Sequence, residues 1–432
     1  MKRRDFLTAC AVLGTSSVGV SLSSQAIAKS ATNINNKAKN IKKAKVVVVG
    51  GGFAGATTAK YLRLLSNNTI DVTLIEPRPH FISCPMSNRI LSGDINLEDI
   101  TLSYATLAKK YGIKIVASTV TEINSLNNTQ SGGSVKCANG EKIAYDKLVV
   151  APGVDFLFNK IAGYDENKHI HAWKAGSQTV DLRKQLVAMP DGGTYVISIP
   201  LAPYRCPPGP YERACLVASY FKQYKPRSKV LILDANPDVV SKPALFKKVW
   251  KEQYDGMVEY HSNFKVTEIK GNTVLNEVED KFSADVLNII PPMQAGLIAT
   301  KNGLGTVWCD IDYATFESTK IPNIYVIGDA STSAPKMPKS GHIANQQGKY
   351  CAYAIVQKLS DAKIEAPIYN NTCYSFGNSK EAGHVAAVYK YSSDIKNMVV
   401  VDGSSAVSPN VSLLEGEYAK SWAKGIWLDT LG

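Results

Sequence analysis

The chain has 432 residues, of which 45% are hydrophobic and 20% are charged, and its formal net charge is +12 at pH 7. This length accommodates two or three domains, and the ordinary composition excludes a largely disordered protein. No apolar run reaches the ~20 residues of a membrane-spanning helix, so we expect no transmembrane segment. The basic excess suits the steering of small anions or of an acidic protein, and we expect no nucleic-acid partner.

The N-terminal segment is typical of an export signal. Arg3 and Arg4 precede a mildly apolar stretch, and Ala26-Ile27-Ala28 is typical of a cleavage site. We therefore predict a twin-arginine signal peptide over residues 1–28 and a flexible basic linker over 29–43. Because this route carries folded, cofactor-loaded proteins, it predicts a periplasmic protein.

The first predicted element of the folded part is a buried strand that runs into a glycine turn. The four valines 46–49 lead into G-x-G-x-x-G and then into a helix, and a second strand over 72–75 ends at an acid 21 residues beyond the last glycine. Such a turn lets backbone approach a pyrophosphate, and such an acid binds a ribose hydroxyl. The predicted dinucleotide-binding residues are Gly50, Gly52, Phe53, Ala54, Gly55 and Glu76.

Later strands and helices predict two more units. An apolar strand that ends at Gly153 closes the first unit, strands over 194–199 and 229–234 flank a helix over 211–224, and a strand over 284–290 echoes the first closing strand. We predict an α/β fold with two Rossmann-like dinucleotide-binding-type domains and a C-terminal α+β interface domain. The expected bounds are 44–158 with 280–345, 159–279, and 346–432, the last consisting of mixed strands and turns beyond residue 359.

A second glycine turn supports a flavin nucleotide. A strand over 324–327 ends at Gly328 and Asp329, and a helix is predicted over 341–359. In flavoproteins with two dinucleotide domains, such an aspartate binds the ribityl chain of FAD. The helix would direct its N-terminus at the flavin ring, and Lys339 would add positive charge there.

The second unit lacks the corresponding fingerprint. Its first strand runs into Pro200–Pro210, a turn with bulky side chains and several prolines where a nicotinamide cofactor needs glycines. We therefore expect that NADH and NADPH do not bind there.

Eight cysteines constrain the chemistry further. Cys10 belongs to the expected signal peptide, which leaves seven, and no C-x-x-C or C-x-x-C-H occurs. We thus expect no metal site and no haem c on this chain. Cys137, Cys215, Cys309 and Cys351 are expected to be buried or to form a further structural pair.

Three motifs resemble one family, the flavoprotein subunits of flavocytochrome c sulfide dehydrogenase, which are related to the sulfide:quinone oxidoreductases. The motifs are Ser83–Asn88, Arg205–Ala214 and Asn371–Ser375. The resemblance implies that Cys84 binds FAD covalently through the flavin 8α-methyl group. It also implies that Cys206 and Cys373 form a redox-active disulfide against the flavin.

The expected activity follows from this resemblance. Hydrosulfide would open the disulfide and leave a persulfide and a thiolate, from which two electrons pass to FAD. Glu212 is a candidate proton acceptor, although it could equally be an ordinary acid at a helix N-terminus. Because the chain lacks a haem motif, the resemblance implies a separate c-type cytochrome subunit.

Two alternatives remain open. Trp422 and Trp427 could belong to a core, a subunit interface or a membrane contact, and the last would suit a membrane-associated sulfide:quinone oxidoreductase. A non-catalytic flavin-bearing or sulfur-binding subunit is the alternative from another class.

Overall fold

The first unit is a parallel sheet between a helical layer and a small antiparallel sheet. The computed structural model describes residues 41–125 and 132–432, so the expected signal peptide and residues 29–40 lie outside it. The sheet has the order β19 (Ile324–Val326), β9 (Lys147–Val150), β1 (Lys45–Val49), β2 (Asp71–Ile75) and β5 (Lys114–Val116). The central strand β1 contains four consecutive valines, because a parallel strand that is covered on both faces needs apolar side chains on both.

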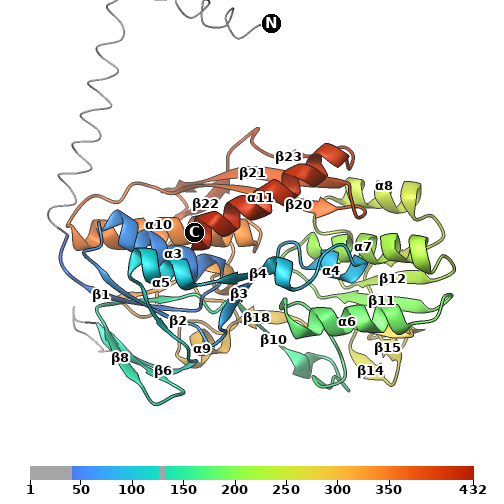
Figure 1. Cartoon of the computed structure of the whole chain (residues 1–432), viewed down its shortest axis with the longest axis horizontal. Coiled ribbons are helices and arrows are strands. Elements are labelled where there is room, and N and C mark those ends of the chain that lie inside the picture. Colours follow the sequence, from blue (N-terminus) through green and yellow to red (C-terminus); the bar gives the residue numbers. More distant parts are fainter. Residues whose placement is uncertain (1–40, 126–131) are drawn as a thin grey trace, which may run out of the picture.

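Two helices from distant parts of the chain cover one face of this sheet. α3 (Phe53–Leu65) and α10 (Gly341–Leu359) pack against each other above it in Figure 1, and β6 (Val120–Ser125), β7 (Gly133–Cys137) and β8 (Lys142–Tyr145) lie on the other side. The N-termini of α3 and α10 therefore meet at the carboxyl edge of the sheet, where open α/β folds bind ligands.

The second unit repeats this plan with a four-stranded parallel sheet. Its order is β13 (Val258–His261), β12 (Lys229–Asp234), β11 (Thr194–Ile199) and β17 (Val286–Ile289). Its helices are α6 (Ser177–Ala188), α7 (Gly209–Tyr224) and α8 (Pro243–Gln253), and a small sheet of β14 (Glu268–Lys270), β15 (Thr273–Leu275) and β16 (Lys281–Ser283) flanks it.

Two of the expected domain bounds differ from the strand pairing. β17 pairs with β11, so the chain stays in the second unit beyond residue 280 and returns to the first at β18 (Met293–Ala295), which pairs with β10 (Val154–Phe156). α10 packs on α3 as far as residue 359, so the C-terminal unit begins after that helix and not at 346. In both places the sheet or helix partner, and not the local sequence, determines which unit a segment joins.

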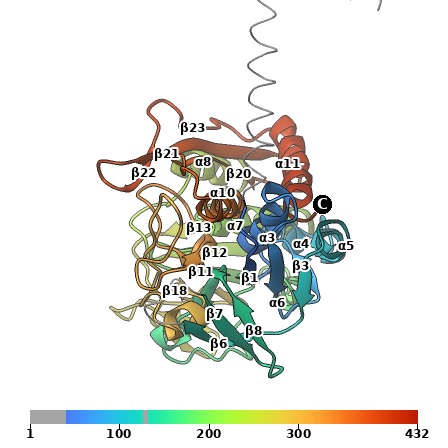
Figure 2. The ribbon, with the colours of Figure 1, turned by 90° about the vertical axis from the view of Figure 1, so that its left-hand side faces the viewer.

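The C-terminal residues form a layer over both units. β20 (Ile368–Phe376), β21 (Ala382–Ser392), β22 (Asn397–Val400) and β23 (Ala406–Val407) form an antiparallel sheet, and α11 (Leu413–Leu431) follows it. In Figures 1 and 2 this layer lies across the top of the molecule, and β20 contacts both α10 and α7. The 19-residue helix α11 was not expected among strands and turns.

Short elements complete the framework. They are β3 (His80–Ile82) paired with β4 (Thr101–Ser103), α4 (Asn88–Ser92), α5 (Ala105–Tyr111), α9 (Leu297–Lys301), and 3-10 turns at Glu98–Ile100, Phe158–Lys160 and Gly328–Ala330. Among the residues that the structure describes, no helix combines the length and apolarity of a membrane span.

Candidate active site

The glycine turn after β1 has the geometry of a nucleotide cradle. Gly50 has φ +97°, and a Cβ on Gly55 would lie 1.9 Å from the Gly50 carbonyl oxygen, so side chains are excluded at both positions. A Cβ on Gly52 would meet nothing within 4 Å, which leaves space in front of the turn. The first turn of α3 carries no acidic residue, so its free N–H groups favour an anion.

Glu76 lies beside this turn, where the sequence predicts it. Its buried carboxylate accepts a hydrogen bond from the Gly51 N–H at 2.7 Å and pairs with Arg78 at 2.9 Å. Tyr104 donates its hydroxyl hydrogen to the Gly51 carbonyl at 3.0 Å. The acid is therefore held at the end of β2, as ribose recognition requires.

Phe53, Ala54, Gly153 and Gly328 surround the same space. A Cβ on Gly328 (φ +72°) would lie 3.1 Å from the Ala54 Cβ, and a Cβ on Gly341 would lie 3.2 Å from the Phe53 ring. Gly153 has φ +69° with nothing near its missing side chain. The structure thus brings the segments at 50–55 and 328 together, and a Cβ on Gly50 would lie 2.3 Å from the carbonyl oxygen of Ala151, just before Gly153.

Asp329 is the strongest indication that a polyhydroxyl group fits here. No residue in the described part of the chain hydrogen-bonds its partly buried carboxylate, and burial raises its pKa against the opposing charges of Arg205 and Lys339. Its oxygens are therefore free to accept hydrogen bonds, which the hydroxyls of a ribityl chain would supply. The residues present therefore fit FAD.

Lys339 stabilises this segment through its main chain. Its Nζ donates to the carbonyl oxygens of Asp329 at 2.9 Å and Ser331 at 2.6 Å, and lies 3.8 Å from the centre of the Trp308 ring. Burial lowers the pKa of Lys339 to about 8. The Lys339 ammonium therefore lies beside the Asp329 segment.

Cys84 lies next to a cation that sequence analysis assigned no role. Although burial opposes the change, the charge of Arg205 lowers the pKa of the Cys84 thiol, and Arg78 acts in the same direction. The guanidinium also faces Asp329 and Cys206. A thiol in such surroundings is a stronger nucleophile than an ordinary buried cysteine.

Cys206 occupies a strained turn between β11 and α7. Its φ is +59°, the left-handed region that a side chain disfavours, and its N–H donates to the Lys339 carbonyl at 2.8 Å. Burial, followed by the charges of Cys373 and Glu212, raises the pKa of the Cys206 thiol well above its usual range. The Cys206 turn is thus fixed to the segment that carries Asp329.

Cys373 reaches the same place from the C-terminal layer. It lies on β20, and the Asn371 side chain donates to its Sγ at 3.3 Å. Ser340, which caps α10, donates its hydroxyl to Asn371 Oδ1 at 2.8 Å. The consecutive residues Lys339 and Ser340 therefore connect to both cysteines, and the charge of Cys373 reaches the surroundings of the Cys206 thiol. In this structure the two sulfurs are not bonded to each other.

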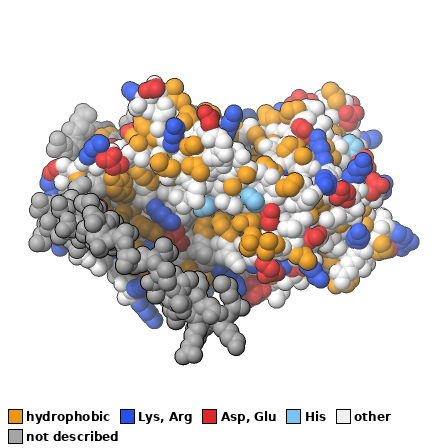
Figure 3. Space-filling model, turned by 90° about the horizontal axis from the view of Figure 1, so that it is seen from above, with side chains coloured by type: hydrophobic (Ala, Val, Ile, Leu, Met, Phe, Trp, Pro, Cys, Tyr) orange, Lys and Arg blue, Asp and Glu red, His pale blue; other side chains and the backbone are white. Residues whose placement is uncertain are grey.

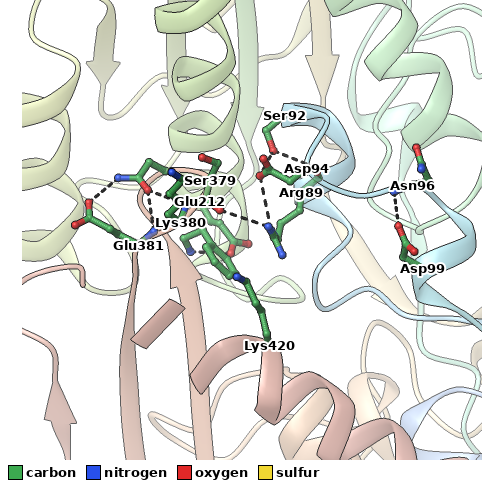
Figure 4. A network of polar contacts seen from close by, with 12 residues as sticks. Arg89, Ser92, Asp94, Asn96, Asp99, Glu212, Ser379, Lys380, Glu381 and Lys420 are labelled. Carbon is green, nitrogen blue, oxygen red and sulfur yellow. Dashed lines mark hydrogen bonds and ion pairs between the residues drawn. The ribbon is translucent and has the colours of Figure 1, made fainter. Parts of the chain in front are cut away.

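Glu212 connects the second unit to the C-terminal layer. Oε1 accepts the Phe376 N–H at 2.9 Å and Oε2 accepts Asn88 Nδ2 at 2.8 Å. Burial raises the pKa of the carboxyl, against these two hydrogen bonds and the charges of Lys242 and Arg89. In Figure 4, Glu212 lies beside the turn at Ser379–Glu381, which Arg89 reaches from α4.

In the second unit, side chains of the unit itself bind the acid that would recognise a nucleotide ribose. Asp234 ends β12, where such folds place the ribose acid, and is fully buried. Tyr211 and Tyr260 donate to its Oδ2 at 2.7 and 3.0 Å, and Asn236 donates to Oδ1 at 2.7 Å. Tyr204, 2% exposed, packs in the proline-rich turn above.

Sequence reasoning did not identify Arg205, Lys242 or Asp234. Arg205 belongs to the motif Arg205–Ala214, but the motif gives it no role of its own. Asp234 ends the second strand of its unit, and this position is the sequence signal that could have identified it. Lys242 had no local signal, because its relation to Cys373 is made by tertiary packing. The four other described cysteines, Cys137, Cys215, Cys309 and Cys351, are buried and unpaired, and the described residues contain no cluster suited to a metal ion.

Family models match three parts of the chain. Residues 179–291 match the central region of the sulfide dehydrogenase (flavocytochrome c) flavoprotein chain, and residues 365–431 match the flavin-binding region of flavocytochrome c sulphide dehydrogenase. Residues 44–189 match the pyridine nucleotide-disulphide oxidoreductases.

Individual relatives agree with these matches. A sulfide dehydrogenase (flavocytochrome c) flavoprotein chain from Chlorobaculum thiosulfatiphilum is 61% identical over 46 residues, which are 11% of this chain and 94% of that sequence. The mitochondrial sulfide:quinone oxidoreductase of Dictyostelium discoideum is 24% identical over 351 residues, covering 77% of this chain and 73% of the relative.

Solved structures share the fold. The sulfide:quinone oxidoreductase of Aquifex aeolicus superposes with a TM-score of 0.74 at 19% identity, covering 89% of this chain and 91% of that chain. NDH2 from Plasmodium falciparum in complex with NADH has a TM-score of 0.63 at 13% identity, with coverages of 90% and 95%. With the matches over its central and C-terminal regions, the chain belongs to the flavocytochrome c sulfide dehydrogenase flavoprotein family, a group of sulfide-oxidising flavin oxidoreductases.

Proposed function

We propose that this chain oxidises sulfide with FAD through a Cys206–Cys373 disulfide and passes the electrons to a separate c-type cytochrome subunit. The observation that carries the proposal is the meeting of Cys206 and Cys373 at Lys339–Ser340, next to Asp329. These cysteines are 167 residues apart, so only tertiary structure brings them to one place.

The residues that would hold FAD are the glycine turn with Glu76, and Asp329 at the end of β19. When bound, FAD accepts an electron pair from thiols and can release electrons singly to a haem. Cys84 is the residue of this chain suited to a covalent bond with the cofactor, because Arg205 and Arg78 favour its thiolate.

The sulfur chemistry takes place on the two cysteines. Hydrosulfide attacks one sulfur of the disulfide, the S–S bond breaks, and the products are a persulfide on one cysteine and a thiolate on the other. A second hydrosulfide removes the outer sulfur as hydrodisulfide and leaves two thiols. Their reoxidation to the disulfide releases two electrons, so two hydrosulfide ions yield one hydrodisulfide ion and one electron pair for each cycle.

Glu212 is placed to take up the protons released by the thiols. Its carboxylate lies between the second unit and β20 and carries charge into the surroundings of both cysteines. Because burial raises its pKa, it is a stronger base than an ordinary glutamate.

The acceptor and the location are inferred from the sequence and the relatives. A relative is named for flavocytochrome c, and this chain has no C-x-x-C-H, so the haem would be on a partner subunit. Arg3, Arg4 and the Ala26-Ile27-Ala28 site support export by the twin-arginine route to the periplasm.

Anaerobic stopped-flow spectroscopy of the flavin-loaded protein tests the proposal. Sulfide should bleach the flavin, and oxidised cytochrome c should restore its colour. Cys206→Ser and Cys373→Ser should each abolish the bleaching while FAD content persists. Full bleaching in either variant would remove the disulfide from the mechanism, and a wild-type protein that is not bleached would be a non-catalytic flavin-bearing subunit.

Quinone is the second candidate acceptor. The outer face of α11 exposes Leu413 and Leu414 at 60%, Tyr418 at 50% and Leu428 at 68%. Figure 3 looks onto this side of the molecule and shows hydrophobic side chains spread across it. Such a face could contact a protein or a lipid surface. Reduction of decylubiquinone in preference to cytochrome c, with flotation on vesicles, would favour the quinone enzyme.

A further inference from the structure

Lys242 is a buried lysine directly beside Cys373. It precedes α8, is 4% exposed and has a left-handed backbone with φ +58°. Its Nζ donates to the Cys373 carbonyl oxygen at 3.0 Å and to the Ser375 Oγ at 2.7 Å. Residues two apart on a strand project to the same face. Because the ammonium binds the Ser375 side chain, it lies on the face of β20 from which the Cys373 sulfur projects.

The charge of Lys242 has no counter-charge in direct contact. Within the described ranges 41–125 and 132–432, Lys242 forms no ion pair with a carboxylate, and its hydrogen bonds go to the neutral oxygens of Cys373 and Ser375. An unpaired buried ammonium is unfavourable. The position of Lys242 at the N-terminus of α8 adds to this, since a helix N-terminus favours anions.

Of the three other buried lysines, Lys339 likewise binds neutral carbonyl oxygens, but its ammonium lies beside Asp329, and the remaining two differ from Lys242. Lys225 donates to the carbonyl oxygens of Val187 and Met189 at the C-terminus of α6, and Lys60 donates to those of Leu428 and Asp429 near the C-terminus of α11. Helix C-termini favour cations, which explains these charges structurally. The same explanation does not apply to Lys242.

We propose that Lys242 is a positioning residue for the cysteine pair: its ammonium stabilises the thiolate that forms on Cys373 when the disulfide opens, and so directs hydrosulfide to Cys206. This inference rests on the proposed function. In the step, the hydrosulfide sulfur bonds to the Cys206 sulfur, the S–S bond breaks, and its electron pair remains on Cys373 next to the ammonium. The products are a Cys206 persulfide and a Cys373 thiolate.

The other charged groups also favour a thiolate on Cys373 over one on Cys206. Lys242 is faced by Cys373 on β20, Cys206 and Glu212 at the start of α7, and Glu415 on α11. The acid Glu212 raises the pKa of both thiols, but at Cys206 its effect exceeds the opposing effect of Arg205, whereas at Cys373 it is smaller than the opposing effect of Lys242. At Cys373 the leading opposition to burial is the charge of Lys242, followed by hydrogen bonds from Asn371 and Ser340.

Thiol titration of the flavin-loaded protein tests this inference. The protein is reduced, treated with iodoacetamide over a range of pH, and digested, and mass spectrometry measures alkylation of the Cys206 and Cys373 peptides. In wild type the midpoint for Cys373 should lie below that for Cys206. Lys242→Met should raise the Cys373 midpoint by about one pH unit, since an opposite charge nearby lowers a thiol pKa by that order. Lys242→Arg should retain most of the wild-type midpoint.

The disulfide equilibrium gives a second readout. A tenfold loss of thiolate stabilisation should lower the Cys206–Cys373 midpoint potential in Lys242→Met by about 30 mV. Lys225→Met removes a comparable buried lysine far from the cysteines and should change neither value. An unchanged Cys373 midpoint in folded Lys242→Met would overturn the inference.

Comparing the Cys206 and Cys373 midpoints in the wild-type protein tests the inference even if the Lys242 variants do not fold. A Cys206 midpoint equal to or below that of Cys373 in wild type would also overturn the inference, without any substitution. Bleaching of the wild-type flavin by sulfide tests the proposed function separately, so failure of one is distinguishable from failure of the other.

Discussion

Arg205 brings one positive charge to three groups from three segments of the chain: Cys84, Cys206 and Asp329. A guanidinium remains charged when it is buried, so it supplies a fixed field where a lysine could lose its proton. The thiolate of Cys84 and the carboxylate of Asp329 would otherwise be disfavoured by burial. Local sequence patterns do not reveal a residue whose partners come from several distant segments of the chain.

The bond between Cys84 and FAD can be tested by acid precipitation. Wild-type protein should keep its yellow colour in the pellet, and a tryptic peptide with Cys84 should be heavier by the mass of the flavin. Cys84→Ala should release the flavin into the supernatant, because only non-covalent contacts remain. Cys137→Ala, which changes a buried cysteine on β7, should behave as wild type. Flavin in the wild-type supernatant would contradict the linkage.

Glu212 should set the acidic limit of activity. Burial raises its pKa, so the carboxylate is lost at a higher pH than for an ordinary glutamate as the medium is acidified. The kcat/KM for sulfide should fall through that raised pKa. Glu212→Gln should flatten this limb and lower kcat by roughly 10²-fold, the smaller end of general-base effects. Glu381→Gln, in the neighbouring turn, should leave the profile unchanged.

At the scale of elements, α11 depends on side chains of α3. Lys60 Nζ donates to the Leu428 and Asp429 carbonyls at 3.0 and 2.9 Å, and Tyr61 donates its hydroxyl hydrogen to Asp429 Oδ1 at 2.7 Å. Lys60 thus satisfies the Asp429 carbonyl in the last turn of the helix and is a second donor to the Leu428 carbonyl, which also accepts the Gly432 N–H.

Lys60→Met should therefore destabilise the protein by about 2 kcal/mol, the usual effect of losing hydrogen bonds to a buried charge. The measurement is the midpoint of urea unfolding at constant slope. Lys420→Met is the matched control: its ammonium pairs with the exposed Glu417, and it should shift stability by less than about 0.5 kcal/mol. Equal effects of the two changes would show that Lys60 does not secure the helix.

The same helix shows where sequence patterns were insufficient. The strands over 194–199 and 229–234 and the helix over 341–359 match the structure, because buried parallel strands and a capped helix have clear local signatures. α11 carries apolar residues on its exposed side, such as Leu414 and Leu428, as well as on the side that packs on α3 and β21, so it lacks a clear one-sided apolar pattern. Ser412 and Glu415 form a capping signal that could have revealed its start: the Ser412 Oγ accepts the Glu415 N–H at 3.2 Å.

At the scale of the whole molecule, three layers each supply one part of the site. The first unit carries the nucleotide cradle, the second carries Cys206 and Glu212, and the C-terminal layer carries Cys373. The glycine turns and the cysteine motifs were predictable from the sequence, whereas the counter-charges from Arg205 and Lys242 arise only when the layers meet. The strand pairing of β17 shows the same dependence, because its sheet partner is chosen by tertiary packing.

The second unit should not accept a nicotinamide cofactor. Asp234 already receives hydrogen bonds from Tyr211, Tyr260 and Asn236, and no glycine turn follows β11. Millimolar NADH should therefore leave the flavin spectrum unchanged under anaerobic conditions in which sulfide bleaches it. Rapid bleaching by NADH would contradict the assignment and indicate a reductase.

The left-handed backbone at Cys206 means that this cysteine lowers the stability of the folded protein. A side chain at φ +59° is strained by about 1 kcal/mol or more, and glycine would relieve that strain. Cys206→Gly should unfold at higher urea concentration than Cys206→Ala, although neither variant has the thiol. Selection for stability alone would therefore favour glycine at this position. In a lineage that no longer used the reaction, we expect glycine here and a more stable, inactive protein.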